Sequence, residues 1–137
     1  KRIVENIDSF EINLFNRTSH IESLNRVKEC DFLILALSDL PNSRVIMHGK
    51  LPHYLLLKKP IIAFVPKYSF VAKLIYETKS GFTISNDKNS GKRLLEIIST
   101  FNYKKYLSQR NEEEIKKYSW ENISKKWLNI LKTNDEQ

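Results

Sequence analysis

The chain has 137 residues, enough for one domain with a hydrophobic core but too few for a two-domain enzyme with its own interdomain cleft. Hydrophobic residues make up 41% and charged residues 28%, which argues against a wholly disordered chain, and no apolar run approaches the roughly 18 residues of a membrane-spanning helix. The single cysteine, Cys30, excludes an intramolecular disulfide and a multi-cysteine zinc site, and three histidines in two separate places argue against a structural metal site.

The formal net charge is +7, from 23 Lys and Arg against 16 Asp and Glu, which favours anionic partners such as nucleotide phosphates, nucleic acid or an acidic bilayer face. The alternative is that the cations form ordinary solvated faces of a lysine-rich protein. Because the cations are dispersed and no aromatic residues interleave with them on one face, we expect no specific nucleic-acid binding. The chain begins at Lys1 without a signal-peptide pattern, so we expect a fragment of a longer cytoplasmic protein.

Apolar runs and helical spacing alternate along the first hundred residues. Strands are expected at Ile12–Phe15, Phe32–Leu37, Ile61–Val65 and Phe82–Ile84, and helices at 19–30, 48–58, 69–78 and around 94–98. Ser19 and Glu22 have the spacing of a capping box, and Gly81 suits the C-terminal cap of the third helix. The pattern predicts an α/β fold with a parallel sheet of about four strands flanked by helices, over residues 1–100.

Residues 101–137 are expected to be a helical extension of the same single domain, which spans 1–137. A charged helix is predicted over Asn102–Lys117, and Ser119 can cap a last helix. The apolar residues of that last helix lie at helical spacing and form one stripe: Trp120, Ile123, Trp127, Ile130 and Leu131. We expect this stripe to cover the sheet of this domain, and the alternative is that it contacts a partner domain.

Ligands of open α/β sheets bind beyond the carboxyl ends of the strands, where the following helices begin. Three loops meet that description, at 16–19, 38–50 and 67–69. In the middle loop, Gly49 lets a phosphate approach the backbone, and free amides, the helix dipole and the ammonium of Lys50 favour an anion. The pair lacks the spacing of a Walker loop, so the alternative is an ordinary exposed lysine after a flexible residue.

His53 follows within one turn, as a hydrogen-bonding group or as a residue that packs in the cleft wall or is simply exposed. No Ser/His/Asp or Cys/His set is evident, so the sequence assigns no catalytic residue.

The run from His48 to Phe82 resembles the C-terminal domain of GT-B-fold glycosyltransferases of the group 1 type. The matching residues are Gly49, Lys50, Leu51, Tyr54, Leu55, Lys59, Pro60, Ile61, Ile62, Ala63, Ser69, Ala72, Glu77, Thr78 and Gly81. The upstream segment ECDFLILAL is similar to a strand of that family, and the closing segment YSWENISKKWLNIL is similar to its aromatic-led last helix. The resemblance covers about residues 12–132.

The resemblance implies a Rossmann-like domain that binds a UDP- or GDP-sugar and faces an N-terminal acceptor domain across a cleft. It implies transfer to a polysaccharide or lipid-linked acceptor, with no metal and no cofactor besides the nucleotide-sugar substrate. In this family pattern Lys50 sits on the donor pyrophosphate beside Gly49, and the loop at 16–18 borders the base. The expected donor-binding residues are Arg17, Thr18, Ser38, Ser43, Arg44, Gly49, Lys50 and His53.

The sequence departs from the family at two acidic positions. The family's Glu before the Tyr is His53 here, and its partner Glu, eight residues earlier, is Val45. These two side chains can therefore accept fewer hydrogen bonds from ribose hydroxyls than two carboxylates could. These departures favour the alternative of a degenerate, non-catalytic Rossmann-like module for nucleotide binding or assembly. Because the N-terminal acceptor domain is missing, we expect the fragment alone to be inactive. We expect the parent enzyme to be bacterial in type and cytoplasmic, peripheral to the anionic inner face of the membrane.

Overall fold

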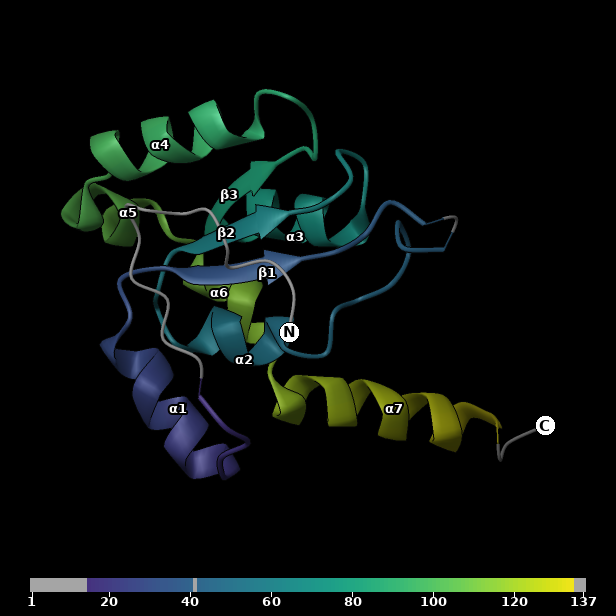
Figure 1. The fold of residues 1–137 in the computed structure, drawn as a ribbon. Helices are drawn as coiled ribbons and strands as arrows, with labels where there is room; N and C mark the ends of the chain where they lie inside the picture. Colours follow the sequence, from purple (N-terminus) through teal and green to yellow (C-terminus); the bar gives the residue numbers. More distant parts are fainter. Residues whose placement is uncertain (1–14, 41, 135–137) are drawn as a thin grey trace.

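The computed structural model describes residues 15–40 and 42–134, which contain three strands and seven helices (Figure 1). In chain order these are α1 (His20–Glu29), β1 (Leu33–Ala36), α2 (Leu51–Leu56), β2 (Ile61–Phe64), α3 (Phe70–Thr78), β3 (Gly81–Ile84), α4 (Ser90–Thr100), α5 (Tyr103–Gln109), α6 (Glu112–Lys116) and α7 (Trp120–Asn134). The predicted α/β alternation and the helical C-terminal region are both confirmed.

The three strands form one parallel sheet in the order β1-β2-β3. Its register aligns Leu33 of β1 with Ile61 of β2, and Ile61 with Gly81 of β3. Three of the four predicted strands are therefore confirmed. The fourth, expected at Ile12–Phe15, lies outside the described residues except for Phe15, which is in an irregular segment.

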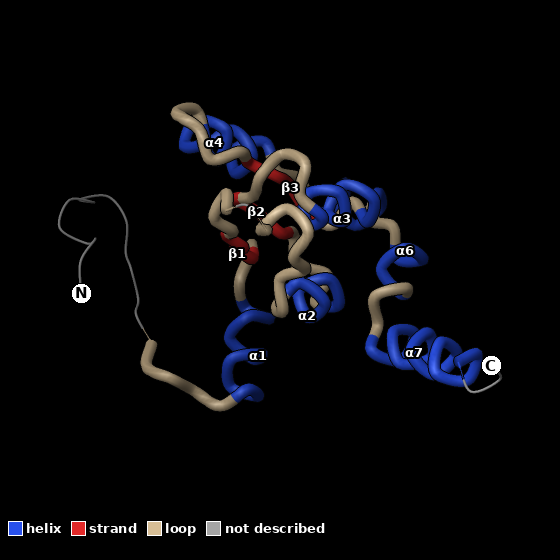
Figure 2. The backbone as a smooth tube through the Cα atoms, turned by 90° about the vertical axis from the view of Figure 1, so that its right-hand side faces the viewer, coloured by secondary structure: helices blue, strands red, loops and turns tan. Residues whose placement is uncertain are grey.

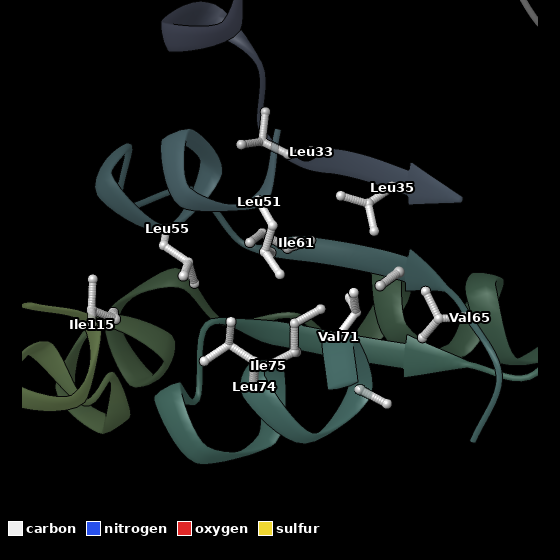
Figure 3. Close-up of a cluster of buried hydrophobic side chains, with 12 residues drawn as sticks. Leu33, Leu35, Leu51, Leu55, Ile61, Val65, Val71, Leu74, Ile75 and Ile115 are labelled. Atoms are coloured by element: carbon white, nitrogen blue, oxygen red, sulfur yellow. The ribbon is translucent and has the colours of Figure 1, made fainter. Parts of the chain in front are cut away.

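Helices α2 and α3 lie on one face of the sheet, and α4 lies on the other (Figures 1 and 2). The core fills the space between the sheet and helices α2 and α3, and α6 contributes Ile115 to it (Figure 3). The buried cluster consists of Leu33, Leu35, Leu51, Leu55, Ile61, Ala63, Val65, Val71, Ala72, Leu74, Ile75 and Ile115. Odd-numbered strand residues supply this face because successive side chains of a strand point to opposite sides.

The opposite face of the sheet is only partly covered. Phe101, which follows α4, packs edge-on against Phe32 and Phe82, with ring centroids 4.7 and 6.1 Å apart. Ile84 is fully buried on this face, but Ile34 of β1 is 61% exposed. Strands of parallel sheets are usually buried on both faces, so the β1 end of this face is open among the described residues.

The helix ends match the sequence predictions only in part. The hydroxyl of Ser19 accepts from the backbone N–H of Glu22 (3.2 Å), as predicted, but the Glu22 carboxylate accepts from Arg26 (2.8 Å) instead of reaching back. At the end of α3 the expectation for Gly81 is wrong. Lys79 adopts the left-handed conformation there, with φ of 47°, and Gly81 begins β3.

The charged segment predicted as one helix over Asn102–Lys117 is divided into α5 and α6. The break falls at Arg110 and Asn111, which are both outside a helix. The side chain of Asn111 accepts from the N–H of Glu114 (3.1 Å) and so caps the start of α6.

The side chain of Arg110 is buried (1% exposed) and ties the helical region to the α/β part. Its guanidinium donates to the Glu112 carboxylate (2.8 Å), to the Tyr106 hydroxyl (2.8 Å) and to the backbone carbonyl of Leu55 in α2. The Tyr106 hydroxyl in turn donates to the carbonyl of Ser80 (3.3 Å). Burial raises the pKa of Tyr106, whereas the Arg110 charge lowers it, and the net direction is upward, which favours the neutral hydroxyl.

Helix α7 does not cover the sheet, so the expectation for its apolar stripe is wrong. It runs away from the sheet beyond α6 (Figures 1 and 2). Of the stripe residues, Trp120 is 63% exposed and Ile123 is half-buried. Within residues 15–40 and 42–134, no helix has the length and apolar character needed to cross a bilayer.

Gly81→Ala tests the tight pairing of β3 with β2. A Cβ at this position would overlap the carbonyl oxygen of Ile61. The two strands can move apart only by weakening the backbone hydrogen bonds between β2 and β3. We expect the free energy of unfolding to fall by about 3 kcal/mol, measured by urea denaturation. Gly91→Ala in α4 is the matched control, because a Cβ there would lie within 4 Å of no other atom. We expect its free energy of unfolding to stay the same or to rise slightly. Equal effects of the two substitutions would contradict this packing.

Arg110→Ala tests the attachment of the helical region. We expect a loss on the order of 3 kcal/mol of unfolding free energy, because the Leu55 carbonyl and the Tyr106 hydroxyl lose a buried partner. Arg93→Ala on the exposed side of α4 removes the same charge and is expected to change stability by less than about 0.5 kcal/mol. If both variants unfold at the wild-type urea midpoint, Arg110 does not hold these elements together.

Candidate functional site

The start of α2 presents three of the residues predicted to bind a ligand. Lys50 immediately precedes the helix, Gly49 lies before it, and His53 is in the first turn. Pro52 suits the start of the helix, because the proline ring holds φ near its helical value. Gly49 and Lys50 are exposed and His53 is half-buried, so all three are accessible to a ligand.

A cavity of about 250 Å³ lies between α1 and the start of α2. It is lined by His20, Ser23, Leu24, Val27, Gly49, Lys50, His53, Tyr54 and Leu57. We call this hollow the α1–α2 cavity. The sequence placed Gly49, Lys50 and His53 together, and the structure brings all three to this cavity.

The wall of the α1–α2 cavity combines imidazole, ammonium and hydroxyl groups with an apolar portion. The rings of His20 and His53 pack edge to face, with centroids 5.7 Å apart. Burial, and to a smaller extent the neighbouring Cys30, raises the pKa of Tyr54, which favours its neutral hydroxyl as a hydrogen-bonding group. The cavity can therefore take a ligand that has a flat apolar ring, hydroxyl groups and a negative charge near Lys50.

The backbone amides at the start of α2 do not match the sequence expectation. The N–H of Lys50 donates to Nδ1 of His48 (3.2 Å), and the N–H of Leu51 donates to the carbonyl of His48 (2.9 Å). Pro52 has no N–H at all. The prediction that these amides are free for an anion is wrong, because His48 uses two of them within its own turn. Attraction for an anion at this point therefore depends on the Lys50 side chain rather than on these two amides.

Arg44 lies at a different place, the edge where the three strands end. It lines a cavity of about 300 Å³ together with Leu37, Asp39, Pro66, Lys67, Tyr68, Ser85 and Asn86. We call this hollow the carboxyl-edge cavity. Arg44 also pairs with Asp39 (3.7 Å), with both side chains more than half exposed, so the pair is a weak restraint. Lys67 lies 5.5 Å from the ring centroid of Tyr68.

Two serines of the loop that follows β1 make different hydrogen bonds. Ser43 is buried, and its hydroxyl donates to the carbonyl of Leu40 (2.8 Å) and accepts from the N–H of Leu40 (3.1 Å). These bonds hold the turn after β1, so Ser43 shapes the loop rather than facing a ligand. Ser38, two residues after the end of β1, is exposed, and its carbonyl accepts from the same Leu40 N–H (3.0 Å).

Arg17 and Thr18 lie in the irregular segment before α1. Arg17 is exposed and Thr18 is half-buried, and neither is among the residues that line the two cavities. The segment nevertheless leads directly to His20, the first residue of α1, which does line the α1–α2 cavity.

Sequence reasoning missed His20, Tyr54 and Ser23 as cavity residues. His20 directly follows the Ser19 cap, so its position at the start of a helix was visible, but its partner His53 lies on another helix. The loop at 67–69 was expected to border a ligand, and Lys67 and Tyr68 do line the carboxyl-edge cavity. Within the described ranges 15–40 and 42–134, no group of three or more His, Cys, Asp or Glu side chains gathers to hold a metal ion.

No protein-family model, curated protein or solved structure matches the chain.

Proposed function

We propose that the chain is the donor-binding domain of a group 1, GT-B-fold glycosyltransferase and that the α1–α2 cavity holds the nucleoside diphosphate of a nucleotide sugar. One observation carries this proposal: Lys50, His53 and His20 line a single cavity between two helices of a parallel α/β sheet. The cation suits the diphosphate, and the imidazoles suit the ribose hydroxyls or the base.

The positions of the family-like residues support the proposal. Gly49 and Lys50 precede α2, Lys59 and Pro60 lead into β2, and Gly81 begins β3. Each lies at the boundary where a Rossmann-like domain needs it, in the order in which the family has them. We infer that the three described strands belong to such a domain and that the rest of its sheet adjoins β1, where Ile34 is exposed.

The size of the cavity limits what it can hold. A volume of about 250 Å³ is smaller than the ~300–1,000 Å³ of typical ligand pockets, so it accommodates only part of a nucleotide sugar. The sugar would extend toward an acceptor domain on a partner segment, and catalysis would need both halves of the cleft. Lys50 would then stabilise charge that develops on the leaving diphosphate, which is a role for a fixed cation in group transfer.

The donor sugar would be linked to UDP or GDP, and the acceptor would be a polysaccharide or a lipid-linked saccharide. In this account the parent enzyme acts in the cytoplasm, at the inner face of the membrane. Neither a metal nor another cofactor is part of the proposal.

A second function is favoured by the backbone amides at the start of α2 and by Val45, which stands where the family has a glutamate. His48 uses the N–H groups of Lys50 and Leu51, and Val45 is 79% exposed and away from the α1–α2 cavity. A degenerate module that binds nucleotide weakly, or that only mediates assembly, is consistent with both observations.

Titration with UDP and GDP, followed by NMR, tests the proposal. We expect shifts at Lys50, His53 and His20, and we expect Lys50→Ala to weaken binding at least tenfold, because a hydrogen bond to a charged group contributes roughly 1.5–3 kcal/mol. Lys92→Ala, an exposed lysine of α4, is the matched control and should leave affinity unchanged.

A paired variant locates the diphosphate. Arg44→Ala with Lys67→Ala removes two cations from the carboxyl-edge cavity and should alter nucleotide affinity less than Lys50→Ala does. If the paired variant abolishes binding while Lys50→Ala retains it, the diphosphate lies at the carboxyl edge instead. The absence of any shift at millimolar nucleotide would favour the assembly module.

A further inference from the structure

Helix α7 is a long amphipathic helix that stands apart from the sheet. Its start is fixed, since the Ser119 hydroxyl accepts from the N–H of Asn122 (3.3 Å) and the Asn122 amide donates to the carbonyl of Lys116 (2.6 Å). Beyond this anchor the helix runs away from the sheet (Figures 1 and 2). Trp120 and Leu128 are mostly exposed, so the helix carries apolar surface that the described part of the chain does not cover.

The charge of α7 is one-sided. Its sequence carries Lys125, Lys126 and Lys132 against a single acid, Glu121. Glu121 already accepts from Lys125 (2.6 Å), whereas Lys126 is exposed. By helical spacing Lys125 and Lys132 fall opposite the stripe of tryptophan and aliphatic residues, and Lys126 falls at the border of the stripe. The sequence of the helix therefore combines an apolar stripe with a net positive charge on its polar side, on a chain whose own net charge is +7.

We propose that α7 docks on the surface of an anionic lipid bilayer, lying in the plane of the interface. A basic polar face opposite a stripe of Trp and Leu is the composition of helices that bind there, with the apolar side among the acyl chains. Tryptophan suits the headgroup level because its ring is apolar and its N–H can still find a partner. Lysines near an anionic lipid surface add an electrostatic attraction that salt screens.

The positive charge of α7 favours an anionic bilayer over a second copy of this chain as the partner. The exposed cation and the surplus of lysine suit a continuous negative surface, whereas a second copy of this chain would bring the same positive charge against itself. The proposal does not rest on nucleotide binding, because α7 shares no residue with the α1–α2 cavity.

Tryptophan fluorescence can report the contact of α7 with lipid. Its two tryptophans, Trp120 and Trp127, both belong to α7, so intrinsic tryptophan fluorescence reports on this helix alone. We expect the emission of the full 137-residue chain to shift to the blue on adding vesicles of phosphatidylcholine mixed with phosphatidylglycerol, and the protein to sediment with them. Pure phosphatidylcholine vesicles should give much weaker binding, and raised salt should weaken binding to the anionic vesicles.

A pair of variants separates α7 from the general charge of the chain. Lys125→Glu with Lys126→Glu should reduce affinity for the anionic vesicles at least tenfold. Lys92→Glu with Arg93→Glu on exposed α4 changes the net charge equally and should have a much smaller effect. Circular dichroism checks that each variant is folded, and Trp120→Ser should weaken vesicle binding without any change of charge.

Three results with vesicles would overturn the proposal: equal losses for the two charge variants, equal binding to neutral and anionic vesicles, or no binding to anionic vesicles at low salt. A blue shift that appears without vesicles as protein concentration rises would also overturn it, since α7 would then bind a second copy. Nucleotide titration of the same samples is independent, so the failure of one proposal leaves the other intact.

Discussion

Parallel pairing of β1, β2 and β3 is the constraint on which the rest of the molecule depends. Parallel neighbours cannot be joined by a tight hairpin, so each connection passes through a helix that crosses the sheet. The strands consequently end at one edge, where Arg44 and Lys67 of different loops line the carboxyl-edge cavity. The start of α2 faces α1, and this arrangement brings Lys50 and His53 to the same hollow as His20.

Burial of Arg110 extends this arrangement into the helical region. A guanidinium is stable inside a protein only when its donors are satisfied, and Arg110 satisfies them on Glu112, Tyr106 and a carbonyl of α2. The same side chain therefore links α2, the helix that Lys50 precedes, with α5 and α6. The helical region is fastened at this polar point as well as through the apolar contact of Ile115, while α7 continues beyond it.

The sequence was sufficient for most of the α/β part because its signals are local. Apolar runs identified the three strands, and Ser19 and Ser69 marked helix starts that the structure has. Long-range features were not predictable in the same way. Nothing in the local pattern shows that His20 meets His53, that Arg110 turns inward, or that His48 takes the amides expected to be free. Such contacts depend on how helices pack, which single-sequence periodicity does not determine.

We propose above all that a nucleoside diphosphate occupies the α1–α2 cavity. Intermolecular nuclear Overhauser effects between UDP or GDP and the protein test it most directly, because they report proximity rather than affinity. We expect such effects from the ribose or base protons to the ring protons of His20 and His53. Effects confined to the ring of Tyr68, at the edge where the strands end, would contradict it.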